Sequence, residues 1–169
     1  PPKAEFQEKQ KPLMSFFAKI KQFFGAGTVQ VELTVPPSVE KARLEVPGTI
    51  KLKALSDQHI LELTVELEEE WESGRGDDKT SKTFELGKLV IASAFDMKLG
   101  EEKTFEFVLP YQLVKSNADQ LKERGGALGA LGSVSALASG EKSKYKVKVE
   151  ADVKGAALDP SDDKEIRLS

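Results

Sequence analysis

The chain has 169 residues, of which 39% are hydrophobic and 31% are charged, and its formal net charge is −3. This composition is typical of one globular domain with an appendage and excludes a chain that is disordered throughout. The absence of cysteine excludes a disulfide framework, a thiolate zinc site and a cysteine nucleophile, and the one histidine, His59, excludes histidine-rich metal clusters within one chain. No uncharged run resembles a transmembrane helix.

The N-terminal part of the sequence divides into two segments. Residues 1–11 are polar and without an apolar period, so we expect a flexible segment there. Residues 12–27 are predicted to form an amphipathic helix followed by a glycine hinge, with Pro12 suited to the first helical position. The apolar face of this helix consists of Leu13, Phe16, Phe17, Ile20, Phe23 and Phe24.

After residue 27 the period of the apolar side chains changes from 3.6 to 2, which indicates strands with one buried and one solvated face. Alternating stretches occur at 29–35, 50–53, 61–71, 84–91, 105–109, 145–153 and 166–168. A slip in the alternation at Gly87 predicts a β-bulge there. We therefore predict a mainly β domain at 28–169, an antiparallel immunoglobulin- or arrestin-like β-sandwich of about seven strands preceded by the N-terminal helix.

A Gly/Ala-rich loop is predicted within this domain at about 111–141. In the stretch 125–140 an aliphatic side chain recurs at every third position. A spacing of three drifts by 60° per step around an α-helix, so it makes no stripe and favours an irregular loop. Loops of this length in compact domains are usually functional or disordered, and Leu128 and Leu131 are therefore candidate partner contacts.

The polar residues of the chain do not assemble a recognisable reaction site. The spacing supplies His59 with no orienting acid or nucleophile, which favours a surface histidine. The acidic run between Glu62 and Glu72 mostly alternates outward, which predicts a solvated face that could protect a strand edge and disfavours nucleic acid. The aspartates at 77–78 and 159–163 favour turns over a calcium loop. We predict no catalytic, cofactor-binding or metal-binding residues.

Several stretches of the sequence resemble the bacterial sporulation-control protein family, whose members have an arrestin-like fold. In chain order these stretches are 14–20, 25–35, the Pro-Gly-Thr-Ile-Lys-Leu run at 47–52, the Phe-Glu-Phe-Val-Leu-Pro run at 105–110, and 145–163. The resemblance implies a β-sandwich and an adaptor or regulatory role without catalysis. Arrestin-like proteins usually have two sandwich lobes, whereas this chain has room for one, and its glycine-rich stretch resembles an insertion.

The helix predicted at 13–24 has four phenylalanines on one face, and three roles are open for that face. That face could cap the sandwich of its own chain, bind a protein partner or copies of itself, or lie on a membrane surface, since four lysines and no acid occur at 9–27. We predict a non-catalytic interaction or self-assembly module, with a protein partner or homo-oligomer and no nucleic acid. The alternative is a peripheral membrane adaptor, and a third hypothesis is a carboxylate-dependent hydrolase.

The residues predicted to bind the partner are Leu13, Phe16, Phe17, Ile20, Phe23, Phe24, Leu128 and Leu131. No cofactor is expected. The lack of cysteine and of a secretory signal favours a cytoplasmic location.

Overall fold

The computed structural model describes residues 28–74, 77, 79–113 and 140–169. In this part of the chain there are eight strands and one short 3-10 helix, η1 (Lys41–Arg43). The strands are β1 (Val29–Thr34), β2 (Ser38–Val39), β3 (Glu45–Ala54), β4 (Gln58–Ser73), β5 (Thr80–Met97), β6 (Glu102–Pro110), β7 (Lys142–Val153) and β8 (Ser161–Leu168).

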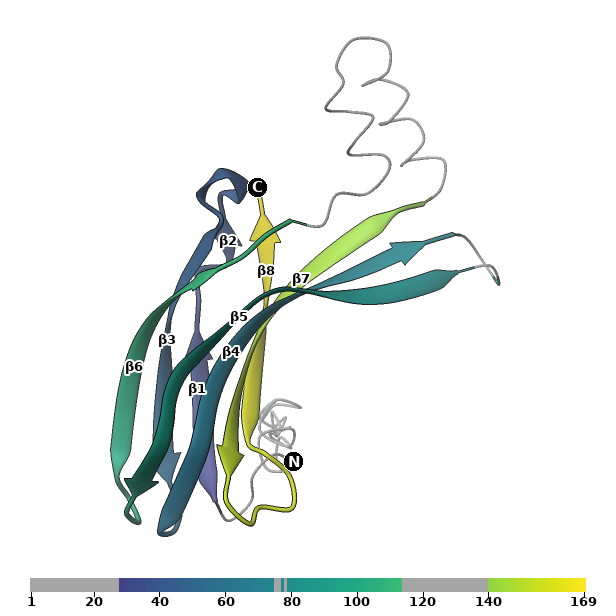
Figure 1. The fold of residues 1–169 in the computed structure, drawn as a ribbon. Coiled ribbons are helices and arrows are strands. Elements are labelled where there is room, and N and C mark those ends of the chain that lie inside the picture. Colours follow the sequence, from purple (N-terminus) through teal and green to yellow (C-terminus); the bar gives the residue numbers. More distant parts are fainter. Residues whose placement is uncertain (1–27, 75–76, 78, 114–139) are drawn as a thin grey trace, which may run out of the picture.

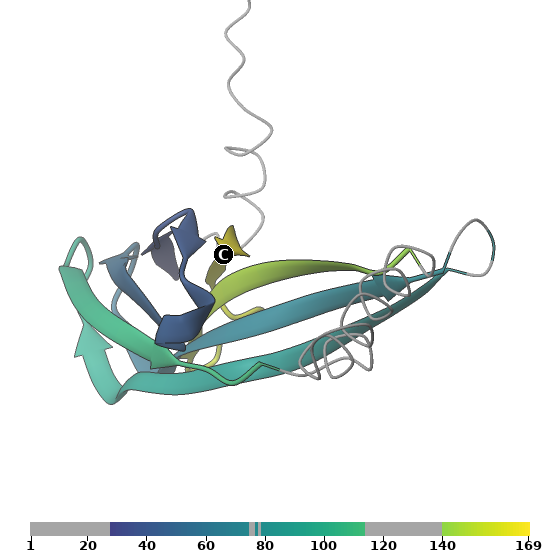
Figure 2. The same ribbon diagram turned by 90° about the horizontal axis from the view of Figure 1, so that it is seen from above.

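The strands form two facing sheets (Figures 1 and 2). One has three strands in the order β1-β3-β6, and the other has five in the order β2-β8-β7-β4-β5. All pairs are antiparallel except the two-residue pair of β2 with β8. The mainly β, two-sheet architecture predicted from the alternation is confirmed, and all seven predicted strands are present. The additional strand, β2, is too short to show a period.

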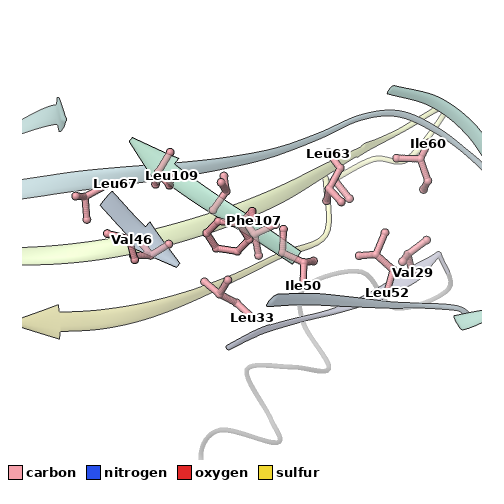
Figure 3. Close-up of a cluster of buried hydrophobic side chains, with 14 of the residues drawn as sticks. Val29, Leu33, Val46, Ile50, Leu52, Ile60, Leu63, Leu67, Phe107 and Leu109 are labelled. Carbon is pink, nitrogen blue, oxygen red and sulfur yellow. The ribbon is translucent and has the colours of Figure 1, made fainter. Parts of the chain in front are cut away.

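The apolar faces of the two sheets meet in one hydrophobic core (Figure 3). Its fully buried side chains come from both layers, which is the arrangement that alternating strands produce when each sheet covers the other. The largest of them are Leu33, Ile50, Leu52, Ile60, Leu63, Leu67, Met97 and Leu109. The core therefore runs from the β3–β4 turn to the row of Glu69, where Ile166 of β8 pairs with Tyr145.

Two register shifts interrupt the pairing of β4 with β5. Leu67 pairs with Gly87 and Glu68 with Glu85, which leaves Leu86 as an extra residue and confirms the bulge predicted at Gly87. Gly87 also permits a close approach of β6, because a Cβ at this position would lie 2.3 Å from the carbonyl oxygen of Pro110. The second shift leaves Ile91 without a paired residue on β4, and the sequence shows no break in the alternation at this point.

Leu61 departs from the predicted pattern. It belongs to the odd-numbered residues of β4 that were expected to point inward, but its side chain is 41% exposed. The reason is an irregularity in the β4–β7 pairing, where the register shifts between Ile60 and Glu62. The inward-facing series of β4 therefore begins at Leu63.

Strands β4, β5 and β7 continue past the end of the three-stranded sheet as a twisted extension (Figures 1 and 2). We call this extension the arm and define it as residues 68–73 of β4, 80–85 of β5 and 142–146 of β7. The two-sheet remainder is called the body. The segments predicted at 1–11 and 12–27, and the predicted loop except for its ends, lie outside the described residues.

Candidate functional site

All the residues predicted from the sequence to bind a partner lie outside the described residues. These are Leu13, Phe16, Phe17, Ile20, Phe23, Phe24, Leu128 and Leu131. Their roles stay predictions. A candidate site within the described residues must therefore come from polar and aromatic groups on the sheets.

His59 acquires an acidic neighbour that its place in the sequence does not reveal. Antiparallel pairing sets it opposite Asp96 on β5, and its Nδ1 lies 2.7 Å from Asp96 Oδ1. Both side chains are open to solvent, with 39% and 76% of their surfaces exposed. In the part of the chain that the structure describes, no hydroxyl joins this pair through a hydrogen bond. The prediction of a surface histidine is confirmed.

A shallow groove of about 670 Å³ lies where β1 diverges from β3 on the three-stranded sheet. Its lining includes Pro36, Pro47, Glu106 and Val108. Glu106 is the charged residue of this lining, so the groove brings no acid–base pair together.

The acidic run of β4 forms a charge ladder with β7 on the outer face of the five-stranded sheet. Four glutamates stand opposite four lysines, in the pairs Glu66–Lys148, Glu68–Lys146, Glu70–Lys144 and Glu72–Lys142. The predicted solvated face is thus confirmed for these glutamates, but they do not protect a sheet edge, because β4 lies between β5 and β7. The alternating charges also leave no one-signed surface for a polyanion.

Ion pairs shift the pKa of several groups on this outer face. The Glu66 carboxylate, 2.5 Å from Lys88 Nζ, raises the pKa of Lys88 through a hydrogen bond and its charge. A hydrogen bond from Lys79 lowers the pKa of Glu72. These pairs are open to solvent, so each contributes little to stability and serves mainly to keep the face charged.

Glu69 is the exception within the acidic run. It lies two residues after Leu67 on β4 and therefore on the same inward face, and only 7% of its surface is exposed. Among the residues that the structure describes, Glu69 is the one charged residue that is buried. The prediction that most of the run alternates outward leaves out Glu69, because an odd-numbered residue of β4 faces the interior rather than solvent.

Strand pairing places an aromatic side chain on each side of Glu69. Its partner on β5 is Phe84, and its partner on β7 is Tyr145, whose hydroxyl donates a hydrogen bond to Glu69 Oε1 at 3.3 Å. Trp71 follows two residues along β4 and therefore shares this face. We call Glu69, Trp71, Phe84 and Tyr145 the arm site. No motif marks it in the sequence, since its residues come from three strands.

The end of β6 reaches the base of the arm beside this site. The amide of Gln112 donates to the Leu86 carbonyl at 2.9 Å. Tyr111 lies against Gly87, since a Cβ added to this glycine would be 3.1 Å from the Tyr111 Cβ. The Tyr111 hydroxyl is buried and has no hydrogen-bond partner in the described part of the chain, and burial raises its pKa. A buried polar group without a partner among the described residues thus lies at the body–arm junction.

Neither a metal centre nor a membrane span is found in the described part of the chain. No three histidine, aspartate or glutamate side chains are gathered there as a metal ion would require. Within residues 28–74, 77, 79–113 and 140–169, no helix has the length and hydropathy to cross a bilayer.

The model of the Spo0M family, described as SpoOM protein, matches residues 17–120 of this chain. The chain belongs to the Spo0M family. This assignment confirms the resemblance to sporulation-control proteins and the arrestin-like fold that it implies. No curated protein matches the chain.

The Spo0M fold is also found among solved structures. The crystal structure of Spo0M, sporulation control protein, from Bacillus subtilis matches with a TM-score of 0.60 and 19% identity, covering 85% of this chain and 50% of that chain. The present chain therefore spans half the length of that protein, and the likeness shows a shared fold. A protein from Archaeoglobus fulgidus matches with a TM-score of 0.37 and 13% identity, over 80% of this chain and 91% of that one.

Proposed function

We propose that this Spo0M-family chain is a non-catalytic interaction module that binds a partner protein through the inner face of its arm. The observation that carries the proposal is the difference in length between the strands of the two sheets. Strands β4, β5 and β7 continue past the three-stranded sheet (Figure 1). The strand register places Trp71, Phe84 and Tyr145 on the inner face of these strands. Aromatic residues of this kind are enriched at the centres of protein interfaces.

The acids of the arm support binding rather than hydrolysis. A carboxylate-dependent hydrolase needs two acids that flank one bond about 5–10 Å apart. Glu69 points inward, whereas its neighbours Glu68 and Glu70 point to the opposite face of the sheet, where lysines of β7 stand opposite them. Among the described strands, the cross-strand neighbours of Glu69 are thus the aromatic residues Phe84 and Tyr145 instead of a second acid.

Within the described strands, β5 lies at one edge of the five-stranded sheet, and its irregularity supports binding through the face of the arm rather than through strand addition. An edge strand can pair with another chain when it is long and regular. β5 has 18 residues, but two register shifts interrupt it, and Ala94 adopts a positive φ of 51°. Such irregularities discourage edge-to-edge pairing. The proposed partner is therefore a different protein, and self-association is an outcome that the test distinguishes.

The helix predicted at 13–24 is proposed as a second contact with the partner. Its support is the sequence pattern, since the segment lies outside the described residues. The membrane alternative relies on the lysines near this segment. It predicts that the whole chain binds anionic vesicles and that the double variant Phe16→Asp/Phe17→Asp does not. If neither the whole chain nor the double variant sediments with the vesicles, this alternative is excluded.

Position-specific cross-linking tests the proposed function. A photoreactive amino acid replaces Ser143, which pairs with Trp71, and in a control chain it replaces Thr83, which pairs with the outward-facing Glu70. We expect a discrete adduct with one partner protein from position 143 in cells of the source organism and none from position 83. Equal adducts at both positions, or none, would contradict the proposal.

Light scattering separates a heterologous partner from self-assembly. The purified full chain is compared with a chain that lacks residues 1–25. A monomeric mass for both agrees with a different protein as partner, whereas an oligomer that dissociates on deletion assigns the N-terminal segment to self-association.

A further inference from the structure

We propose that Asp162 and Lys164 form a latch between the two sheets, which prevents the edges of β1 and β8 from pairing with a strand of another chain. The inference concerns the body and is independent of the function proposed for the arm. It is carried by three features of the described residues: a backbone amide at the edge of β1, a carboxylate of β8 that accepts its hydrogen, and the inward direction of the two charged side chains.

The first feature is the orientation of the backbone groups of β1. Within the described strands, β1 lies at one edge of the three-stranded sheet and pairs with β3 alone. The amide of Leu55 donates to the Thr28 carbonyl oxygen, so from Thr28 onward the even-numbered residues direct their backbone groups toward β3. Those of the odd-numbered residues, among them Leu33, point away from β3. A row of such groups is a template on which another strand can pair.

The second feature is the group that accepts the Leu33 amide hydrogen. This amide donates to Asp162 Oδ2 at 2.8 Å, and Asp162 belongs to β8 of the other sheet, 129 residues further along the chain. Strands β1 and β8 lie close together, but they are not paired as strands. A side chain of β8 therefore replaces a strand as the hydrogen-bond partner of β1 at this point.

The third feature is the inward direction of Asp162 and Lys164. On β7 their partners are Val149 and Val147, which are both fully buried in the core. Partners in a sheet direct their side chains to the same face, so the two charged side chains lie on the inner face. Inward-pointing charges on an edge strand discourage pairing with another chain. β2 pairs only with the last two residues of β8, so the latch lies at the edge of the described sheet.

The carboxylate of Asp162 is held in place by hydrogen bonds within the described residues. Lys164 Nζ donates to both of its oxygens, at 2.9 Å to Oδ2 and 3.1 Å to Oδ1, and the Asp163 amide donates to Oδ1 at 3.0 Å. The side chain of Asp162 is 15% exposed, whereas that of Lys164 is 44% exposed. A cation and two amides thus compensate the desolvation of a charge that lies beside the core.

The latch occupies positions where the apolar face of β8 could continue. Ile166, the next residue of the inward series, is buried in the core. An aliphatic residue at 162 would extend that series, but it would leave the Leu33 amide without its acceptor and both edges without a charge. The charged pair is therefore explained by the edges that it closes rather than by the burial of apolar surface.

Native-state hydrogen exchange on the dilute full chain tests the hydrogen bond of the latch. In Asp162→Ala the Leu33 amide has lost its acceptor in the folded state, so we expect its exchange to accelerate at least about tenfold more than that of the Ile50 amide. Ile50 is the reference because it is paired with Leu33 but directs its backbone groups toward β6. Equal acceleration of both amides, or of neither, would overturn the role of Asp162.

Light scattering on the full chain tests the consequence for association. At higher concentration we expect Asp162→Ala to form assemblies of larger mass than the unaltered chain. The matched control is Asp163→Ala, which removes an exposed acid of the same strand whose ion pair with Lys146 is 3.7 Å long. It should keep the mass of the unaltered chain. An Asp162→Ala chain with unchanged mass, or a control that associates equally, would contradict the latch.

A second variant, Asp162→Asn, provides the test if Asp162→Ala does not fold. Its amide oxygen still accepts the Leu33 hydrogen, but the charge and the ion pair with Lys164 are lost. We expect Asp162→Asn to associate more than the unaltered chain, because the inward charge that opposes strand pairing is removed. A folded Asp162→Asn with the mass of the unaltered chain would refute the need for this charge.

Hydrogen exchange in the assemblies identifies the surface that associates. The amides of Val31 and Leu33 both point away from β3, so pairing of another strand with the edge of β1 should protect both of them relative to the dilute variant. Assemblies in which these two amides stay unprotected would place the contact on another surface and would refute the proposal that the latch guards β1.

Discussion

The body and the arm are built from the same strands, but their inner faces have different chemistry. In the body, the inward residues of β4 are Leu63, Val65 and Leu67, and each is fully buried against the three-stranded sheet. In the arm the same series continues as Glu69 and Trp71. The change from aliphatic to acidic and aromatic side chains occurs where the second sheet ends. The inner face of β4 therefore differs in chemistry between the two regions.

The outer faces of the two regions show no such change. The ladder of glutamates and lysines runs from Glu66 in the body to Glu72 in the arm without a break in the register of β4 with β7. A difference confined to the inner face therefore reflects what covers that face rather than a general property of the strands.

The largest expected effect tests whether the body is a tightly packed core. Leu63→Ala should lower the free energy of unfolding by about 3 kcal/mol, because it leaves a cavity between two sheets. The matched control Leu61→Ala, at the exposed irregularity two residues earlier, should change it by less than about 0.5 kcal/mol. Urea denaturation measures both. Similar losses for the two variants would contradict the separation of inner and outer faces.

The junction of body and arm is tested by Gly87→Ala. The added Cβ would meet the Pro110 carbonyl oxygen at 2.3 Å, so β6 and β5 must move apart. We expect a loss of about 2 kcal/mol, which is typical of overpacking at a closed contact. Thr83→Ala, an exposed change on the same strand, serves as control. A neutral Gly87→Ala would show that the close approach of β6 is not required.

The ladder in the arm is tested by a charge exchange. Lys144→Glu places a second acid opposite Glu70 and should destabilise the chain by less than about 1 kcal/mol, since the pair is open to solvent. The double variant Glu70→Lys/Lys144→Glu restores opposite charges and should recover most of that loss. Both losses should shrink in high salt. Additive effects of the two substitutions would mean that the residues do not interact.

The smallest effect concerns the far end of the body. The amide of Leu99 and the ammonium of Lys98 hold the pKa of Asp57 below its model-compound value of 3.8. A lowered pKa stabilises the fold fully above 3.8, and this contribution is lost as the pH falls through the folded-state pKa. The stability difference between the unaltered chain and Asp57→Asn should therefore decrease at pH values below 3.8. A difference that is the same at neutral and acid pH would exclude this linkage.

The sequence predicts the strands well because alternation is a local signal. It places all seven longer strands and the bulge at Gly87, where glycine coincides with a slip in the period. It fails at Leu61, because an irregular pairing with β7 reorients that residue without any mark in the pattern. It also misses the acid beside His59, since Asp96 is 37 residues away and arrives through strand pairing.

The arm site could not be predicted for a further reason. Periodicity assigns Glu69 to the inward face, but it does not show where the covering sheet ends or which residues of β5 and β7 stand beside it. Those facts depend on the register between strands, which is set by the whole fold. The candidate contacts at 13–24 and 128–131 remain sequence predictions.

Native-state hydrogen exchange along β4 tests most directly whether body and arm are distinct regions of one sheet. We expect the amides at 63–67 to exchange only through global unfolding, because the three-stranded sheet covers them. The amides at 69–73 should exchange through local opening at a lower free energy. Equal protection along the whole of β4 would contradict the distinction between a packed body and an arm available to a partner.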